Sequence, residues 1–453
     1  MSKPLVLIHL SDIHFNKKWC DYYDLDQDVR DQLEKDVAEM RKRLNNNARG
    51  VLITGDVAFA GNKNDYDEAL KWLNRLCELA GCREQDVWCV PGNHDIDRDV
   101  FANSIFIRGL HDRLRVKNPD EVDERLAECL RDAAGAVELF RPLQNYNNFA
   151  AKFSCKSQPD PLAWQHELDL NDNSKLRIFG ANSTLVSHES DNNADRRLIL
   201  GTIQSRPTEQ AGVIYLLMCH HPPDWLLEYD NVNMNLDARV KVQLFGHKHL
   251  RTIEERNNCV RIVAGAVHPS RKEQQWKPRY NWLVLSVRGA DADRRLEVDI
   301  YPRVWSDARP EYIADVAPCP TGQDHRTVSL RLEPWTAPAA AAPAPFIAAG
   351  PTADPATTAS VAQGDPKVSE RGMDMDAART LTYRFLSLSH VARIEVAQKL
   401  ALLDDSDEGL MDFELFGRIF ERAMRQQKLE SLWEVVEAAH GDGHNPRNPY
   451  VGQ

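Results

Sequence analysis

Five short motifs in this chain gather the side chains that bind metal ions and move protons. In chain order they are Asp12-Ile13-His14, Gly55-Asp56, Gly92-Asn93-His94-Asp95, His220-His221-Pro222 and Gly246-His247-Lys248-His249. Imidazole, carboxylate and amide ligands suit borderline first-row divalent metals rather than calcium. Two such ions, about 3.5–4 Å apart, generate hydroxide near neutral pH and neutralise the charge on a phosphoryl group under attack. The motifs therefore indicate hydrolysis of a phosphoester at a two-metal site.

Each motif directly follows a short apolar run that predicts a buried β-strand. The runs are LVLIHLS, VLIT, VWCV, VIYLLMC and VKVQLF. Metal ligands at the ends of such strands would converge on one edge of a sheet. Between the strands, residues 26–44 and 65–79 carry apolar side chains at a helical period. This alternation predicts an α/β layered fold.

The order D-x-H, G-D, G-N-H-D, H-x-P, G-H-x-H resembles that of the calcineurin-like metallophosphoesterase superfamily. The spelling of the motifs is most similar to that of its class III cyclic-nucleotide phosphodiesterases. The resemblance implies a β-sandwich flanked by helices, two divalent metal ions (manganese, iron or zinc), and attack by a hydroxide that bridges them. It also implies a ligand set: Asp12, His14 and His249 for the first metal, Asp56 as the bridge, and Asn93, His220 and His247 for the second.

The same resemblance assigns His94 and Asp95 to catalysis rather than to metal binding. His94 would lie beside the leaving-group oxygen as general acid or transition-state stabiliser, and Asp95 would fix the tautomer and orientation of its ring. The residues alone leave His220 and His221 open, because alternate residues of a strand point to opposite faces. The H-x-P pattern of the superfamily favours His220.

A simpler interpretation exists for any one of these residues, as a solvated loop side chain or a satisfied partner in the core. A protein that keeps the fold and binds without turnover is a further alternative. The five motifs occur intact and in order, and no ligand position is replaced. This combination argues against both alternatives.

Length and composition predict a large cytoplasmic protein that does not enter a membrane. With 453 residues the chain exceeds what one core usually serves, so we expect two domains. No apolar run approaches the roughly eighteen residues of a membrane helix, and the N-terminus is better explained as a first strand than as a secretory signal. Nine scattered cysteines predict reduced thiols.

Composition divides the chain into three parts. Residues 1–333 carry all five motifs and form the predicted metallophosphoesterase domain. Within it, residues 97–153 are charged and helix-like, which predicts a helical cap that shapes access to the metals; an insertion remote from the site is the equally weighted alternative. Residues 334–367 are rich in Ala and Pro and predict a disordered linker.

Residues 368–453 predict a separate small all-α bundle. Large apolar residues recur at a helical period in four stretches, near 381–388, 391–400, 413–424 and 429–436. The region contains no cysteine and no convergent acid–base group, so we expect an adaptor rather than a catalyst. It loosely resembles effector-associated adaptor domains of bacterial conflict systems, which implies a protein partner. Self-association or a merely stabilising role is the alternative.

Charge favours a small substrate over a polymer. The chain has 56 Lys+Arg against 68 Asp+Glu, whereas a protein that holds long nucleic acid usually shows a basic face. The run from His268 to Trp282 interleaves basic and aromatic residues that could hold a nucleotide, although a solvated loop before a strand is the more common explanation. The sequence thus predicts a phosphodiesterase acting on a nucleotide phosphoester. The alternative is a nuclease or nucleotide phosphatase effector, recruited or activated through residues 368–453.

Overall fold

The chain separates into two compact units, Met1–Ala342 and Pro343–Gln453. The computed structural model describes residues 3–15, 26–270, 277–336, 381, 384–385, 388, 390–404, 407, 412–440 and 448. The predicted linker at 334–367 lies almost entirely outside these residues. The boundaries at 333 and 368 therefore stay predictions.

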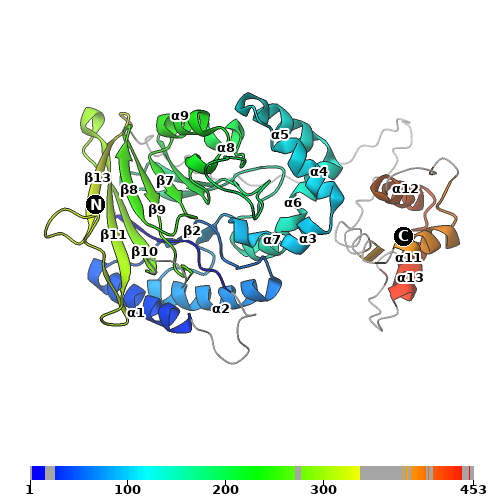
Figure 1. Ribbon diagram of the computed structural model, residues 1–453, viewed down its shortest axis with the longest axis horizontal. Helices are drawn as coiled ribbons and strands as arrows, with labels where there is room; N and C mark the ends of the chain where they lie inside the picture. The colour runs from blue at the N-terminus through cyan, green and yellow to red at the C-terminus, as the bar shows by residue number, and fades with distance from the viewer. Residues whose placement is uncertain are drawn as a thin grey trace, which may run out of the picture. The chain divides into compact units, whose positions relative to one another are not determined.

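Two β-sheets form the centre of the first unit (Figure 1). One sheet has the strand order β12-β11-β10-β1-β2-β3, with β13 paired to β11, and the other has the order β4-β5-β6-β7-β9-β8. The strands are β1 (Leu5–Leu10), β2 (Gly50–Ile53), β3 (Val87–Cys89), β4 (Trp164–Asp169), β5 (Lys175–Gly180), β6 (Val213–Cys219), β7 (Val242–Phe245), β8 (Thr252–Arg256), β9 (Cys259–Val263), β10 (Arg279–Arg288), β11 (Arg295–Ser306), β12 (Glu311–Ala314) and β13 (Arg326–Arg331). Strands β1 to β3 run parallel, and so do β5, β6, β7 and β9.

Successive residues of β6 face two different cores. Ile214, Leu216 and Met218 belong to the large core that also contains the side chains of β1 and β2. Leu217 and Cys219 belong to a second core beneath helix α9 (Tyr229–Arg239). Because neighbouring side chains of a strand point to opposite faces, a strand covered on both sides must be apolar throughout. This explains the uninterrupted run VIYLLMC.

Helices cover both sides of the sheets. Figure 1 shows α1 and α2 along one side, and α8 and α9 along the other. The helices that precede α9 are α1 (Gln27–Leu44), α2 (Lys63–Ala80), α3 (Arg98–Ala102), α4 (Ile105–Leu114), α5 (Val122–Arg131), α6 (Ala133–Phe140), α7 (Gln144–Ala150) and α8 (Thr202–Ser205). The predicted α/β layered sandwich flanked by helices is confirmed.

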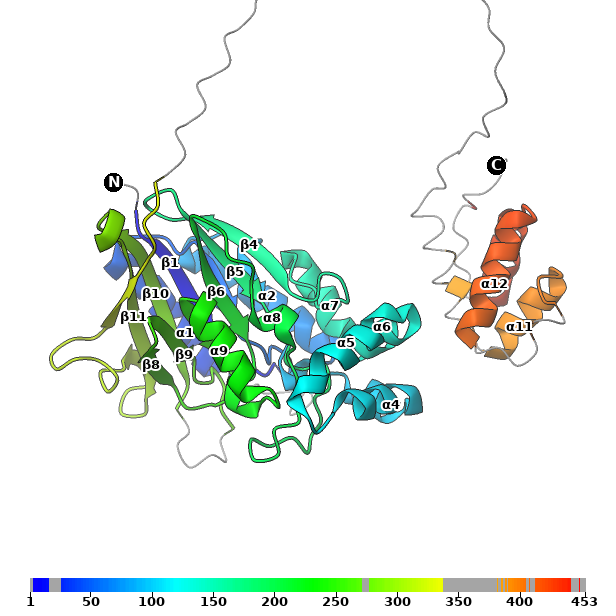
Figure 2. The same cartoon turned by 90° about the horizontal axis from the view of Figure 1, so that it is seen from above.

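The segment 97–153 is helical, and its helices α3 to α7 gather at one end of the sheets (Figures 1 and 2). In α7, the Tyr146 hydroxyl donates to the carbonyl of Cys89 in β3 at 2.9 Å. The Asn145 amide donates to the carbonyl of Gly61, in the loop after the second motif, at 2.9 Å. The segment is thus tied to the strand and to a loop that carry metal-site motifs. Its role in selecting the substrate stays a prediction.

The described part of the second unit is all helical, as predicted. It contains α11 (His390–Lys399), α12 (Asp412–Arg425) and α13 (Leu429–His440). Their apolar core consists of Leu381, Phe385, Leu388, Val396, Ala397, Leu402, Leu415, Ile419, Ala423, Leu432, Trp433 and Val436. The helix predicted near 381–388 falls largely on residues outside the described part. Across both units, none of the described helices has the length and apolar composition of a membrane span.

Candidate metal centre

The five motifs meet where parallel strands of both sheets end. They follow β1, β2, β3, β6 and β7, in that order. Ligand atoms lie within 4.8 Å of one another in four overlapping groups: Asp12, His14 and His249; Asp12, Asp56 and His220; His14, Asp56 and His94; and His220, His221 and His247. Asn93 joins them, because its Oδ1 lies 3.0 Å from His220 Nε2 and 3.0 Å from His247 Nδ1. The structure therefore brings all seven predicted ligands together.

Two buried carboxylates lie at the middle of this cluster. Among the described residues, neither Oδ1 of Asp12 nor Oδ2 of Asp56 accepts a hydrogen bond of normal geometry. His249 Nε2 is 3.5 Å from the first oxygen, and His220 Nε2 is 3.3 Å from the second. Burial alone would raise the pKa of both carboxyls, but the surrounding imidazoles lower the pKa of Asp12 to about 2 and hold that of Asp56 well below its usual range. Both groups are carboxylates at neutral pH, as metal ligation requires.

Two of the imidazoles are kept in the neutral form that binds a metal. Burial lowers the pKa of His14 to about 4 and that of His247 to about 3. Both rings are therefore neutral near pH 7 and keep a lone pair for a metal.

Four of the predicted ligands adopt a left-handed backbone. The φ angles are 52° at Asp12, 52° at His14, 56° at Asp56 and 64° at His247. This region is uncommon for residues other than glycine, although Asp and His enter it more often than most. Backbone strain of this kind concentrates at functional sites, where the surrounding structure enforces it. The loops after β1, β2 and β7 are therefore shaped for the cluster rather than for relaxed geometry.

Two motif glycines allow the loops to approach each other. A Cβ on Gly92 would lie 2.0 Å from Asp56 Oδ1, and a Cβ on Gly55, whose φ is +96°, would lie 2.5 Å from His220 Nδ1. The backbone N–H of His94 donates to the same Asp56 Oδ1 at 2.8 Å. Any larger residue at position 92 would displace the carboxylate predicted to bridge the metals.

His220 and His221 make different contacts. Nδ1 of His220 donates to the Thr54 carbonyl at 2.7 Å, which directs Nε2 toward Asp56 and Asn93. In the neutral ring, such a hydrogen bond leaves the lone pair on Nε2. Burial lowers the pKa of His220, but Asp56 raises it further, to about 9. The Nδ1 of His221 instead lies 2.9 Å from the Ser183 hydroxyl. These contacts support the choice of His220.

Asp95 positions the loop after β2 and does not contact the ring of His94. Its carboxylate accepts hydrogen bonds of 2.8 to 3.3 Å from the Tyr66 hydroxyl and from the backbone N–H groups of Asp56, Val57, Ala58 and Gly92. Burial and the nearby Asp56 raise its pKa to about 6. The ring of His94 is oriented by the Phe59 carbonyl, which lies 2.7 Å from Nδ1. The prediction that Asp95 fixes the His94 tautomer is therefore wrong, because backbone donors and Tyr66 already occupy its oxygens.

Sequence patterns gave no role to two aromatic residues that border the cluster. The Phe59 ring lies 5.2 Å from the His94 ring, between centroids, and the Trp225 ring lies 4.0 Å from that of His247. Phe59 comes three residues after Asp56, and Trp225 comes three residues after Pro222. An aromatic residue so soon after a ligand motif is the signal that could have identified both.

The basic and aromatic run from His268 to Trp282 does not form a nucleotide-binding surface in its described part. Tyr280 and Trp282 are fully buried in β10, and Arg279 is 9% exposed. Positions 271–276 lie outside the described residues. Rings enclosed in a sheet cannot stack on a base, so the prediction is wrong for Tyr280 and Trp282.

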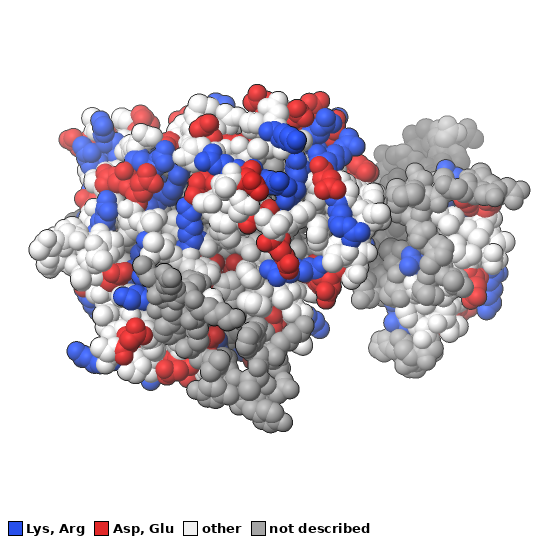
Figure 3. Space-filling view, viewed as in Figure 1, with Lys and Arg blue, Asp and Glu red and all other residues white. Residues whose placement is uncertain are grey.

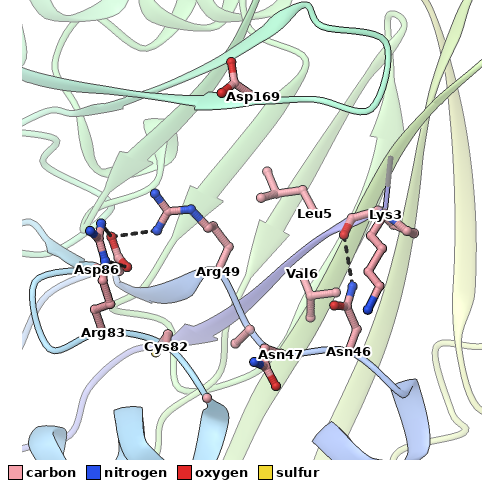
Figure 4. Close-up of a pocket in the computed structure, with 13 residues that line it drawn as sticks. Lys3, Leu5, Val6, Asn46, Asn47, Arg49, Cys82, Arg83, Asp86 and Asp169 are labelled. Atoms are coloured by element: carbon pink, nitrogen blue, oxygen red, sulfur yellow. Dashed lines mark hydrogen bonds and ion pairs between the residues drawn. The ribbon is translucent and has the colours of Figure 1, made fainter. Parts of the chain in front are cut away.

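A separate pocket of about 440 Å³ lies at the amino-terminal ends of β1, β2 and β3 (Figure 4). Its lining includes Leu5 at the start of β1, Arg49 before β2, and Arg83 and Asp86 before β3. Arg49 and Arg83 lie 2.6 and 2.7 Å from Asp86. Because β1 to β3 are parallel and the ligand cluster follows their carboxyl ends, the pocket and the cluster lie at opposite ends of these strands. The pocket contains none of the predicted site residues.

Comparison with protein families finds two matches along the chain. The model of the calcineurin-like phosphoesterases matches residues 5–269, which contain every predicted ligand and catalytic residue. The model of the GTPase-associated adaptor domain matches residues 377–438, within the predicted helical module.

Individual proteins give more limited similarity. An uncharacterized metallophosphoesterase-like protein of Bacillus subtilis, YydB, is 31% identical over 121 residues, which are 26% of this chain and 22% of that protein. Vps29 from Entamoeba histolytica is 12% identical with a TM-score of 0.27, covering 73% of this chain and 100% of its own. A putative 5'-nucleotidase from Staphylococcus aureus is 12% identical with a TM-score of 0.32, covering 63% of this chain and 51% of its own.

Proposed function

We propose that this chain, which belongs to the calcineurin-like phosphoesterase family, is a dinuclear metal-dependent phosphodiesterase. Its substrate would be a nucleotide phosphoester. One observation carries the proposal: Asp12 and Asp56 each keep a buried carboxylate oxygen without a normal hydrogen bond inside a shell of imidazoles. Burying such groups is costly unless a cation compensates them.

The donor set fits two divalent metal ions. Following the family pattern, one ion would be held by Asp12, His14 and His249, the other by Asn93, His220 and His247, and both by Asp56. When bound, two such ions supply a hydroxide nucleophile near neutral pH and stabilise the charge on the phosphoryl oxygens. Nitrogen, carboxylate and amide donors suit manganese, iron or zinc.

In this proposal, His94 acts on the leaving group. The Phe59 carbonyl can only accept a hydrogen bond, so Nδ1 of His94 carries a proton. Nε2 is then available to hold a second proton, which stabilises or protonates the leaving oxygen. Asp95 acts on the reaction indirectly, because it holds the backbone of Asp56, Val57 and Ala58 in position.

Surface charge supports a small substrate. On the face of the first unit shown in Figure 3, Lys and Arg are interspersed with Asp and Glu and do not form a continuous basic surface. A protein that binds a long nucleic acid through its backbone would need such a surface. A mononucleotide ester depends mainly on contacts inside the metal centre.

The direct test compares hydrolysis of bis-p-nitrophenyl phosphate and p-nitrophenyl phosphate by the manganese-loaded protein. We expect the diester to be preferred and its hydrolysis to be lost in His94→Ala. Preference for the monoester would replace the phosphodiesterase with a phosphatase. Two bound metals with no turnover of either ester would contradict a free-standing enzyme.

A second candidate function is that of a nuclease or nucleotide phosphatase effector recruited by a protein partner. The match of residues 377–438 to a GTPase-associated adaptor domain favours it. We expect a chain lacking residues 334–453 to hydrolyse a generic diester as fast as the full chain. If that deletion abolishes hydrolysis, the C-terminal module is required for activity and the effector hypothesis is preferred.

A further inference from the structure

We propose that Phe59 is a platform on which the base of a nucleoside leaving group stacks, so that this ring selects nucleoside esters over esters with non-aromatic leaving groups. The inference rests on the proposed function, because it concerns the substrate of the same site. It assigns a binding role to a side chain that no motif includes.

The Phe59 ring is open to solvent beside the metal centre. Its exposed fraction is 39%. Its centroid lies 5.2 Å from the His94 ring at an interplanar angle of 38°, and 6.0 Å from the His14 ring at 74°. A single exposed apolar side chain is ordinary on a protein surface. An exposed phenyl ring beside two histidines of the cluster is different, because it offers an apolar face next to the groups proposed to act on the substrate.

Hydrogen bonds hold the backbone that carries this ring in place. The N–H of Phe59 donates to the Phe15 carbonyl at 3.0 Å, and its own carbonyl accepts from His94 Nδ1 at 2.7 Å. The preceding N–H groups of Val57 and Ala58 are bound by the Asp95 carboxylate. A binding surface on a loop fixed in this way loses little conformational entropy when a ligand stacks on it.

The position of the ring indicates which part of the substrate it meets. His94 is the residue proposed to act on the leaving-group oxygen, and Phe59 is its aromatic neighbour. Trp225 instead lies against His247, which belongs to a different group of candidate ligands from His94. A leaving nucleoside carries its base one sugar ring away from the scissile bond, which suits a platform beside His94. Aromatic stacking contributes about 1–3 kcal/mol per base and tolerates any base.

The test measures binding of two inert phosphonates to the manganese-loaded full-length chain by calorimetry. The 5'-phosphonates of adenosine and of ribose share the charged group and the sugar, and their carbon–phosphorus bond cannot be hydrolysed. We expect the adenosine compound to bind the wild type about tenfold more tightly, as one stacked base predicts. Phe59→Leu should remove most of this preference and leave the affinity for the ribose compound unchanged, whereas Phe59→Tyr should keep the preference.

A matched control is Phe106→Leu, because Phe106 in α4 has the same exposed fraction of 39%. This variant should bind both phosphonates as the wild type does. Fluorescence of the 2-aminopurine riboside 5'-phosphonate gives a second measurement, since stacking on Phe59 should quench it and Phe59→Leu should relieve the quenching.

Equal affinity of the wild type for both phosphonates would overturn the inference, and so would a preference that survives in Phe59→Leu. Neither result would affect the proposed function, which depends on diester hydrolysis and its loss in His94→Ala. Conversely, a protein that turns over no phosphoester but shows the Phe59-dependent preference would refute the hydrolase and keep the nucleoside-binding surface.

Discussion

The two units of this protein differ in the kinds of side chain that they bury. In the first unit, buried carboxylates and imidazoles converge at the strand ends, and four predicted ligands adopt a left-handed backbone. In the described part of the second unit, the buried residues are almost all apolar, and the charged groups form ion pairs such as that of Arg422 with Asp407. Packing in the second unit stabilises the bundle itself. Packing in the first unit also provides the free energy needed to keep the carboxylates of the metal centre buried, where a bound cation can compensate their charge.

A substitution should therefore have different consequences in the two units. A polar change at the metal centre should alter chemistry and metal content with limited effect on the second unit. An apolar truncation in the bundle should unfold that unit and leave a generic hydrolysis unchanged. Four substitutions test this separation.

The largest effect is expected for Asp56→Asn. An amide cannot replace the carboxylate predicted to bridge two cations, so metal occupancy and hydrolysis should fall together, with activity reduced by roughly a thousandfold or more. Elemental analysis and the bis-p-nitrophenyl phosphate assay measure the two quantities. Asp169→Asn is the control, since Asp169 is an exposed partner of Lys175. Retention of both metals and of activity in Asp56→Asn would show that the bridging assignment is wrong.

Trp433→Ala should affect only the second unit. Trp433 is 4% exposed, and removing so large a buried ring costs about 3–5 kcal/mol. We expect the helical signal of α11 to α13 to melt at a lower temperature, while the rate of diester hydrolysis is unchanged. Met424→Ala, at a position 43% exposed, should change neither. Loss of hydrolysis in Trp433→Ala would mean that the two units do not act separately.

His94→Gln should separate turnover from metal binding. Loss of a proton donor at the leaving group should lower kcat by about a hundredfold or more, whereas metal content should stay at the wild-type level because His94 is not a predicted ligand. His325→Gln, at a histidine stacked on Tyr301, serves as the control. A parallel loss of metal in His94→Gln would place this residue among the ligands.

The smallest effect is expected for Tyr66→Phe. Its hydroxyl donates to Asp95 Oδ1 at 2.9 Å, and removing a buried hydrogen bond costs about 1 kcal/mol. The melting temperature of the first unit should fall by a few degrees. Tyr312→Phe is the matched control, because the buried Tyr312 hydroxyl has no hydrogen-bond partner among the described residues. A comparable loss in Tyr312→Phe would remove the argument for the Asp95 network.

The clustering of the candidate ligands could be predicted from the sequence, because each candidate follows a strand in a short motif. The order of the motifs singled out Asp12, Asp56 and Asn93 as candidates, and parallel strands then place their ends together. By contrast, the interpretation of the run from His268 to Trp282 as a nucleotide-binding segment failed at Tyr280 and Trp282. Strand pairing with β1 and β11 buries these rings instead.

The α/β sandwich, the helical module and the residues that could hold two metals are predictable from sequence, because strand and helix periods and motif order are local properties. Three features required the folded structure: that His220 rather than His221 faces Asp56, that Asp95 binds the 56–58 backbone rather than His94, and that Phe59 borders the site. These depend on contacts such as that of His220 with the Thr54 carbonyl, between residues 166 positions apart. Spacing along a chain does not encode such distances, since only the packing of two sheets brings the groups together.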